Sequence, residues 1–327
     1  MAAAVRRWLI LAQFVGLSLV VGSGFLFMTV ALEGLSYAQV AWARALLGAA
    51  ALLVAVGLSR QLVLPTRAAT WGHVGVLAVT NLAIPYVLFA WAQQHISSGL
   101  GSVYNATGPL MTAVIAGVAR IERLRGLQIA GIVLGLVGVV LIMAPWAQGP
   151  LAVDLHGSLV ALAAVASIAF SFVYTRKFIP PSELPGASLS VLVACGTAIV
   201  MLALTPVMAL SPVQLTWHVA IGILVLGVLH SGLGVMLSLN IIHALGPSRA
   251  ATSMYLAPVV GMVLGVVVLD ESVAVHQLVG AAITLIALFF VRPRTPTPGQ
   301  ADSSATARIS TNDVVTAQRP SHKGFTG

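Results

Sequence analysis

Two stretches of the sequence decide the fold: GPLMTAVIAGVARIERLRGLQIAG at residues 108–131 and APVVGMVLGVVVLDESVAVHQLVG at residues 257–280. A shift of 149 residues places a proline, a glutamate, a glutamine and a glycine of one stretch on those of the other. The aligned pairs are Pro109 with Pro258, Glu122 with Glu271, Gln128 with Gln277 and Gly131 with Gly280. Because self-similarity at a fixed offset is typical of an internal repeat, we expect a chain built from two related halves.

The composition around these stretches is that of a membrane protein. Of the 327 residues, 59% are hydrophobic and 7% are charged, against roughly 45–50% and about 25% in soluble domains. Ten apolar stretches of membrane length follow one another, each bounded by charge, proline or turn residues. They lie at about 8–30, 38–58, 71–92, 100–119, 126–146, 157–175, 187–208, 217–241, 249–268 and 275–291. We therefore expect an all-α integral membrane protein with ten transmembrane helices.

The placement of Lys and Arg predicts the orientation of these helices. Cytoplasmic loops retain basic residues, and every second loop of this chain contains none. The basic residues of the remaining loops and of the helix ends are Arg6, Arg7, Arg60, Arg67, Arg120, Arg123, Arg125, Arg176, Lys177, Arg249, Arg292 and Arg294. This distribution predicts that both termini are cytoplasmic. It also explains the net charge of +8 as an orientation signal, so we expect a lipid bilayer and no nucleic acid as partner.

The spans divide into two halves of five. Five is an odd number, so the second half should be inverted relative to the first, as in transporters that bind substrate near the midplane between inverted repeats. We expect the first repeat at 1–146 and the second at 147–294. Residues 295–327 are rich in Pro, Ser, Thr and Gly and are predicted to form a disordered cytoplasmic tail.

With these motifs the chain resembles the drug/metabolite transporter superfamily, specifically its ten-helix members with two EamA-like domains. The resemblance covers about residues 8–291 and includes Arg44 in AQVAWARALLGAAALL, which matches the arginine of the family's second helix. Two departures stand out: Val21-Gly22-Ser23-Gly24-Phe25 replaces the usual Trp-Gly of the first helix, and the seventh helix has no arginine opposite Arg44. The resemblance implies export of amino acids or other small metabolites.

Polar residues inside the spans are the candidate binding residues, because burying them in a bilayer is costly. Arg44 is either an anchor for a substrate carboxylate or a clamp between helices. His230 either carries a proton or is a neutral packing residue. In the resembling family the third, fourth, eighth and ninth spans line a central cavity. Their polar residues here are Asn81, Tyr104, Asn105, Thr107, Asn240, Ser253 and Tyr255.

The motif residues have a structural and a functional interpretation. Glu122 and Glu271 each precede a membrane helix, so each carboxylate is predicted to cap a positive helix end, with proton coupling as the alternative. Pro109 and Pro258 lie inside the fourth and ninth spans, where proline frees a carbonyl and bends a helix.

These features favour a secondary carrier for a small-molecule substrate, coupled to protons or to exchange, in the plasma membrane of a prokaryote-like cell. A multidrug or cation exporter is the alternative, and a sugar-phosphate exchanger would require more basic residues inside the spans. An integral membrane enzyme is less favoured, because we find no catalytic cluster, cofactor motif or metal-ligand spacing, and Cys195 is the single cysteine. A scaffold without transport is the remaining alternative.

Overall fold

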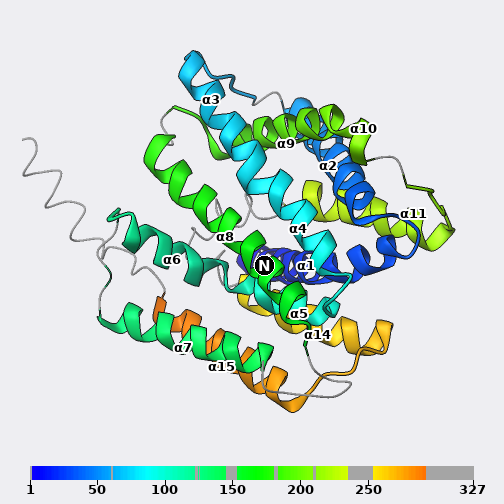
Figure 1. Ribbon diagram of the computed structural model, residues 1–327. Coiled ribbons are helices and arrows are strands. Elements are labelled where there is room, and N and C mark those ends of the chain that lie inside the picture. The colour runs from blue at the N-terminus through cyan, green and yellow to red at the C-terminus, as the bar shows by residue number, and fades with distance from the viewer. Residues whose placement is uncertain are drawn as a thin grey trace, which may run out of the picture. The chain divides into compact units, whose positions relative to one another are not determined.

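The computed structural model describes residues 2–59, 62–121, 124, 126–144, 153–179, 183–208, 211–234 and 253–291; the side chains of 2–14, 58–59, 208, 233, 253–255 and 291 are outside this description. All regular secondary structure within these ranges is helical (Figure 1). In the first half the helices are α1 (Ala2–Leu32), α2 (Tyr37–Ser59), α3 (Ala68–Leu77), α4 (Ile84–Ala92), α5 (Ser98–Ala106), α6 (Gly108–Val118) and α7 (Gly126–Met143). In the second half they are α8 (Leu155–Phe178), α9 (Gly186–Ala203), α10 (Thr205–Met208), α11 (Trp217–Leu224), α14 (Ser253–Leu269) and α15 (Val275–Val291).

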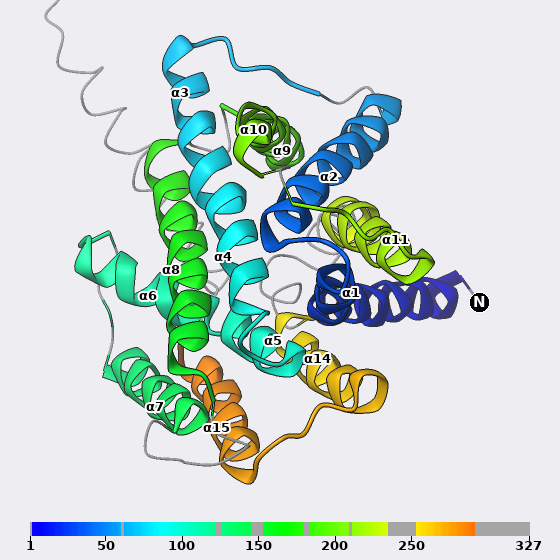
Figure 2. The same cartoon turned by 45° about the vertical axis from the view of Figure 1, so that its right-hand side comes forward.

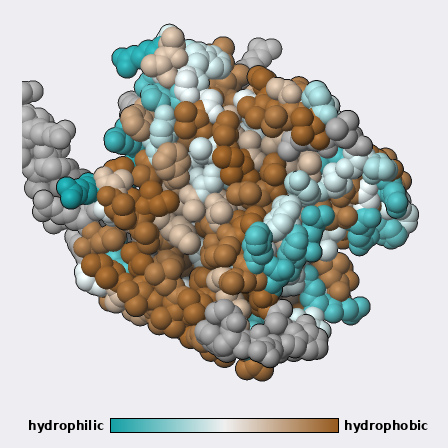
Figure 3. Space-filling model, viewed as in Figure 1, coloured by the Kyte–Doolittle hydropathy of each residue, from teal (hydrophilic) through white to brown (hydrophobic). Residues whose placement is uncertain are grey.

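The lengths of these helices suit a membrane. Among the described residues, six segments are long and apolar enough to cross one: Val15–Leu32, Tyr37–Gly57, Ala68–Ala92, Gly126–Met143, Leu155–Phe178 and Gly186–Ala203. Three shorter apolar helical segments follow at Trp217–Gly232, Leu256–Leu269 and Val275–Phe290. Apolar side chains cover much of the outer surface in Figure 3, and many large ones are exposed. An apolar exterior of this kind is stable in lipid and not in water.

The fourth expected span, 100–119, is not one continuous helix. It is divided into α5 and α6 by a turn at Thr107, whose hydroxyl donates to the carbonyl of Tyr104 at 2.6 Å. Pro109 is at the start of α6 rather than inside a helix. The break occurs here because proline has no N–H to donate to the preceding turn. Its counterpart Pro258 does lie inside α14, as the sequence predicted.

The helix pairs follow the two halves of the chain. The helices α7 and α15 lie side by side in Figures 1 and 2, and α2 packs against α9 and α5 against α14. The pairs α7 with α15 and α2 with α9 join helices at corresponding places of the two halves, whereas α14 corresponds to α6 and packs against α5, the preceding part of the same span. Between α7 and α15, the contact is backbone-close, because a Cβ added to Gly280 would meet the carbonyl oxygen of Gly138. Small residues allow such close approach between membrane helices.

Two π-helical segments interrupt the third and eighth spans. The segment η1 (Ala78–Ala83) joins α3 to α4, and η2 (Val225–Leu233) follows α11. Adding 149 to the bounds of η1 gives 227 and 232, which lie within η2. A π-helix bonds from residue i to i+5, and each carbonyl oxygen has a second lone pair that can accept from a side chain. In η1 the Ala78 carbonyl accepts from Thr197 of α9 at 2.9 Å, and the Thr80 carbonyl accepts from Ser167 of α8 at 2.7 Å.

Candidate functional site

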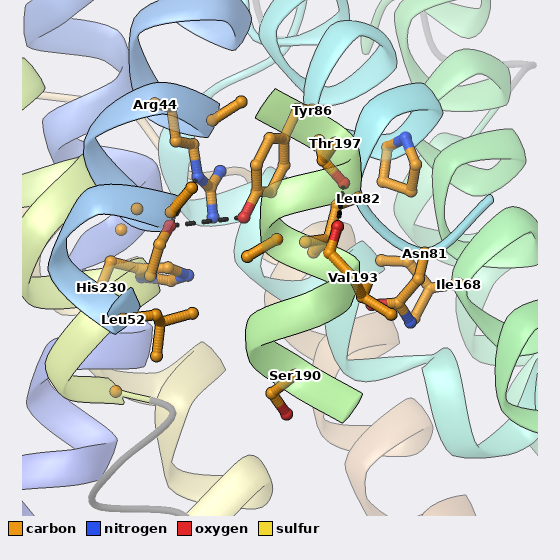
Figure 4. Close-up of a pocket in the computed structure, with 18 of the residues that line it drawn as sticks. Arg44, Leu52, Asn81, Leu82, Tyr86, Ile168, Ser190, Val193, Thr197 and His230 are labelled. Carbon is orange, nitrogen blue, oxygen red and sulfur yellow. Dashed lines mark hydrogen bonds between the residues drawn. The ribbon is translucent and has the colours of Figure 1, made fainter. Parts of the chain in front are cut away.

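A cavity of about 670 Å³ lies among α1, α2, α4, α8, α9 and the two π-helical segments (Figure 4). Most of its lining is apolar, for example Leu52, Leu82 and Ile168. Two other lining residues, Phe25 and Phe89, pack edge to face with ring centroids 5.2 Å apart. The lining also includes Gly186, an exposed residue at the start of α9, so the cavity reaches the surface beside α9.

The two halves of the chain contribute corresponding positions to this cavity. Among the lining residues, six pairs differ in number by 149. They are Arg44 and Val193, Ala45 and Ala194, Gly48 and Thr197, Asn81 and His230, Leu82 and Ser231, and Pro85 and Gly234. The cavity therefore lies where the two halves meet, which is where ligand sites form between repeats.

Arg44 is the charged group of the cavity. Its side chain is 8% exposed, its Cζ atom lies 4.1 Å from the centroid of the Tyr86 ring, and its Nε donates to the Ser231 hydroxyl at 3.4 Å. The Tyr86 and Ser231 hydroxyls are also 3.4 Å apart. Figure 4 shows Arg44 and Tyr86 pointing toward each other from opposite walls. An aromatic face and a hydroxyl solvate a guanidinium only in part, so the group remains a strong donor to an anion.

The described lining of the cavity holds no counter-charge for Arg44, since it contains no aspartate or glutamate. A buried cation without a carboxylate is stabilised when an anion binds, because the pair replaces lost hydration. The cavity is therefore suited to a ligand with a negative group at one end and apolar bulk at the other.

His230 lies beside this group on η2. Its Nδ1 is 3.2 Å from the carbonyl oxygen of Val20 on α1, and the imidazole points into the cavity in Figure 4. The ring packs so closely on Gly24 that a Cβ at that position would overlap Nδ1 and Cε1. Glycine is required here because any side chain would displace the imidazole.

The other predicted cavity residues are placed differently from one another. Asn81 lines the cavity from η1 and donates from Nδ2 to the Ser171 hydroxyl at 2.6 Å, and Asn105 lines it from α5. Tyr104 does not line it: this side chain is 0% exposed, and its hydroxyl donates to Ser158 of α8 at 2.9 Å. Thr107, also fully buried, is outside the cavity at the turn between α5 and α6. The remaining predictions, Asn240, Ser253 and Tyr255, lie outside the side chains that the structure describes.

Glu271 caps a helix, but not the one that follows it in sequence. Its carboxylate accepts from the backbone N–H groups of Ser98 at 2.6 Å and Gly99 at 3.1 Å, which begin α5. The sequence placed this cap on the helix that became α15, and that assignment is wrong. A carboxylate at a helix N-terminus satisfies free donors and favours the positive helix end. The loop before α15 is thereby bonded to the first half of the chain.

The rest of the repeated motif supports helix ends and helix packing. The side-chain oxygen of Gln277 accepts from the N–H of Ala274 at 3.1 Å, at the start of α15. Gln128 and the buried Gly131 lie on α7, and Gly280 lies at the α7 contact of α15. Glu122 lies outside the described residues.

Three residues of the site were not predicted from the sequence: Tyr86, Ser231 and Gly24. Ser231 directly follows His230 in the eighth apolar span, so it is itself a polar residue inside a span and could have been selected as a candidate on that ground. Gly24 could be suspected only from a need for close contact. Nothing in the sequence around Tyr86 indicates that it faces an arginine 42 residues away.

Comparison with known proteins assigns the chain to a family. The model of the EamA-like transporter family matches it twice, over residues 6–144 and 155–292. A protein of Streptantibioticus cattleyicolor named "Probable terminal-alkyne amino-acid exporter" is 26% identical over 84% of this chain and 90% of its own length. The "Uncharacterized transporter YdfC" of Bacillus subtilis is 24% identical over 82% of this chain and 87% of its own. A solved crystal structure, 20% identical, superposes with a TM-score of 0.59 over 85% of this chain and 94% of that one, which shows a shared fold. Since the family model covers most of both halves, the chain belongs to the EamA-like transporter family.

Proposed function

We propose that this chain is a secondary transporter that exports small amphipathic metabolites with a carboxylate, amino acids first among them. The observation that carries the proposal is Arg44, a buried guanidinium at the wall of a mainly apolar cavity whose described lining has no acidic residue. One named relative supports the same class of cargo, because its name specifies an amino-acid exporter. Family membership itself makes the chain a multi-pass membrane transporter with a small-molecule substrate.

The carboxylate is proposed to bind at Arg44, Tyr86 and Ser231. A guanidinium binds a carboxylate through two parallel hydrogen bonds, and the neighbouring hydroxyls add further donors. The apolar part of the substrate then lies against the α8 and α9 side of the cavity, where Ile168 and Val193 are lining residues. This orientation separates a polar head from an apolar tail.

Transport is proposed to proceed by alternating access between two inverted repeats of five helices, with both termini cytoplasmic. The six pairs of lining positions at an offset of 149 support a site shared by the halves. The cavity reaches the surface beside α9. Exchanging which end is open would move a bound solute across the bilayer. Energy would come from a proton gradient or from exchange.

An exporter of organic cations is less well supported. The described lining has aromatic residues, which can attract a cation, but it has no carboxylate and includes a guanidinium. Arg44 would repel such a substrate.

Flux measurements in proteoliposomes test the proposal. Purified protein is reconstituted, and uptake of labelled amino acids, quaternary amines and sugar phosphates is measured with and without a pH gradient. We expect saturable flux of at least one apolar amino acid and none of the amines. Flux confined to amines or sugar phosphates, or no flux through folded protein, would contradict the proposed function. Acceleration by the pH gradient would assign proton coupling, and acceleration by internal substrate would assign exchange.

A further inference from the structure

We propose that His230 recognises the amino group of the substrate, so that the cavity selects apolar α-amino acids over carboxylates that lack an amino group. The inference rests on the proposed function and deepens it. It assigns a specificity-determining role to a residue that the sequence marked as a candidate cavity residue, with a proton carrier and a packing residue as its two interpretations.

The hydrogen bond to α1 fixes the tautomer of the ring. The partner of Nδ1 is the backbone carbonyl oxygen of Val20, at 3.2 Å. A carbonyl oxygen only accepts, so the proton of this bond belongs to Nδ1. In the neutral ring Nε2 then carries the lone pair. His230 therefore offers an acceptor, rather than a donor, at its second nitrogen.

That acceptor is available to a ligand. His230 lines the cavity and is partly exposed, and its imidazole makes the Val20 contact through Nδ1. The ring cannot easily turn away, because Gly24 packs against its Nδ1 and Cε1 edge. A side chain held on one edge by a backbone bond and by tight packing presents the other edge in a defined direction.

The imidazole and the anion site line the same cavity (Figure 4). Ser231 follows His230 on η2, and its hydroxyl accepts from Arg44. An α-amino acid has its carboxylate and its ammonium group on one carbon, so neighbouring donor and acceptor sites match it. The described lining contains no acidic residue that could bind the ammonium group instead. Neutral acceptors must do so, and among them His230 directly precedes Ser231, the serine that accepts from Arg44.

Competition for leucine transport tests the inference. Uptake of labelled L-leucine into proteoliposomes is inhibited with unlabelled leucine, with isocaproate, which lacks the amino group, and with isoamylamine, which lacks the carboxylate. We expect leucine to inhibit about 10- to 100-fold more strongly than isocaproate, the value of one hydrogen bond to a charged group. Isoamylamine should inhibit least, because it has no group for Arg44.

Two substitutions of His230 distinguish the role of Nδ1 from that of Nε2. His230→Asn retains an amide near the Nδ1 position and removes the acceptor near Nε2, whereas His230→Gln places an amide near Nε2. We expect the Asn variant to lose the preference for leucine over isocaproate while isocaproate inhibits as before, and the Gln variant to retain part of it. His218→Gln, at an exposed position outside the cavity lining, is the matched control and should behave as wild type.

Each outcome bears on a different statement. Leucine flux with equal inhibition by isocaproate in the wild type, or full preference in folded His230→Asn, overturns the role of His230 and leaves the proposed function intact. Loss of the preference in Asn105→Ala but not in His230→Asn would assign the amino group to Asn105 and also overturn the inference. Saturable flux of other carboxylate metabolites without leucine flux overturns the inference alone. The absence of flux for every solute overturns both.

Discussion

The two halves of the chain supply the same backbone to the cavity but different side chains. At corresponding places the first half has Arg44 and the second has Val193. The π-helical segments differ in the same way, since η2 provides His230 and Ser231 where η1 provides Asn81 and Leu82. One repeated scaffold thus produces two unlike sides of the cavity. We call the side with Arg44, His230 and Ser231 the polar wall, and the α8 and α9 side with Ile168 and Val193 the apolar wall.

This difference separates two requirements of a carrier. In the proposed mechanism the repeated backbone would provide two related conformations that open at opposite ends, whichever side chains line the cavity. The unequal side chains provide one binding direction for a substrate with a head and a tail. A second arginine at the place of Val193 would bring another unpaired cation into the membrane, at a cost of about 2.5–3.5 kcal/mol on insertion scales.

Removal of the single cation should abolish the polar wall. For Arg44→Ala we expect leucine flux to fall by about 100-fold, because a charge-assisted carboxylate contact is lost. Arg44→Lys should retain part of the flux, since lysine keeps the charge but not the two-bond geometry. Initial uptake rates in proteoliposomes measure both. The control Arg67→Ala removes an exposed arginine and should leave flux unchanged. Wild-type flux in folded Arg44→Ala would show that the arginine only braces helices.

A charge on the apolar wall should remove the difference between the halves. We expect Val193→Arg to lower leucine flux by about tenfold, because an unpaired charge then occupies the place of the apolar tail. Val193→Ile keeps the wall apolar and of similar volume, and its flux should stay within about twofold of wild type. Equal flux in the Arg and Ile variants would contradict a polarised cavity. Size-exclusion chromatography establishes that both proteins fold.

The close contact between α1 and η2 should be sensitive to a single methyl group. Gly24→Ala places a Cβ where the imidazole of His230 lies, so the ring must shift. We expect flux to fall several-fold and the melting temperature to decrease, because overpacking typically costs about 1–3 kcal/mol. In the control Gly57→Ala, the added Cβ meets no atom within 4 Å. The Gly57→Ala variant should transport normally. A loss of flux equal to that of Gly24→Ala would show that replacing a helix glycine, and not displacing His230, causes the effect.

The bond between the halves at Glu271 should affect stability more than transport. Glu271→Gln keeps the shape but weakens the cap on α5, so we expect a loss of about 1 kcal/mol. This corresponds to a decrease of about 2–4 °C in the melting temperature for a chain of this class. Asp270→Asn changes the adjacent, exposed carboxylate and should not shift the temperature. Equal shifts in the two variants would indicate a general effect of charge instead of a specific cap.

The sequence predicted the membrane fold and the repeat because both depend on one-dimensional properties, the length of apolar stretches and the spacing of a motif. It also selected Arg44, Asn81, Asn105 and His230, since a polar group inside a span is costly unless it has a role. It did not separate Asn105 from its neighbour Tyr104. Successive helix residues point about 100° apart, and which face meets the cavity is a tertiary property.

Three other features could not be predicted for related reasons. Glu271 shortly precedes α15 in sequence, so the sequence suggested that it caps this helix. It caps α5 instead, which is distant in sequence and adjacent only in the fold. The break at Thr107 was not expected, because the apolar stretch 100–119 is long enough for one continuous helix. The π-helical segments have no compositional signature in η1 or η2, because their hydrogen-bond pattern is set by the packing of neighbouring helices.

The paired π-helical segments also affect the direction of the side chains around them. A π turn holds one residue more than an α turn, so the residues beyond it are rotated about the helix axis relative to a regular α-helix. Both halves have this feature at corresponding positions, within 78–83 and 225–233. Removing one residue from either segment would therefore change which side chains of that half face the cavity while leaving the other half as it is.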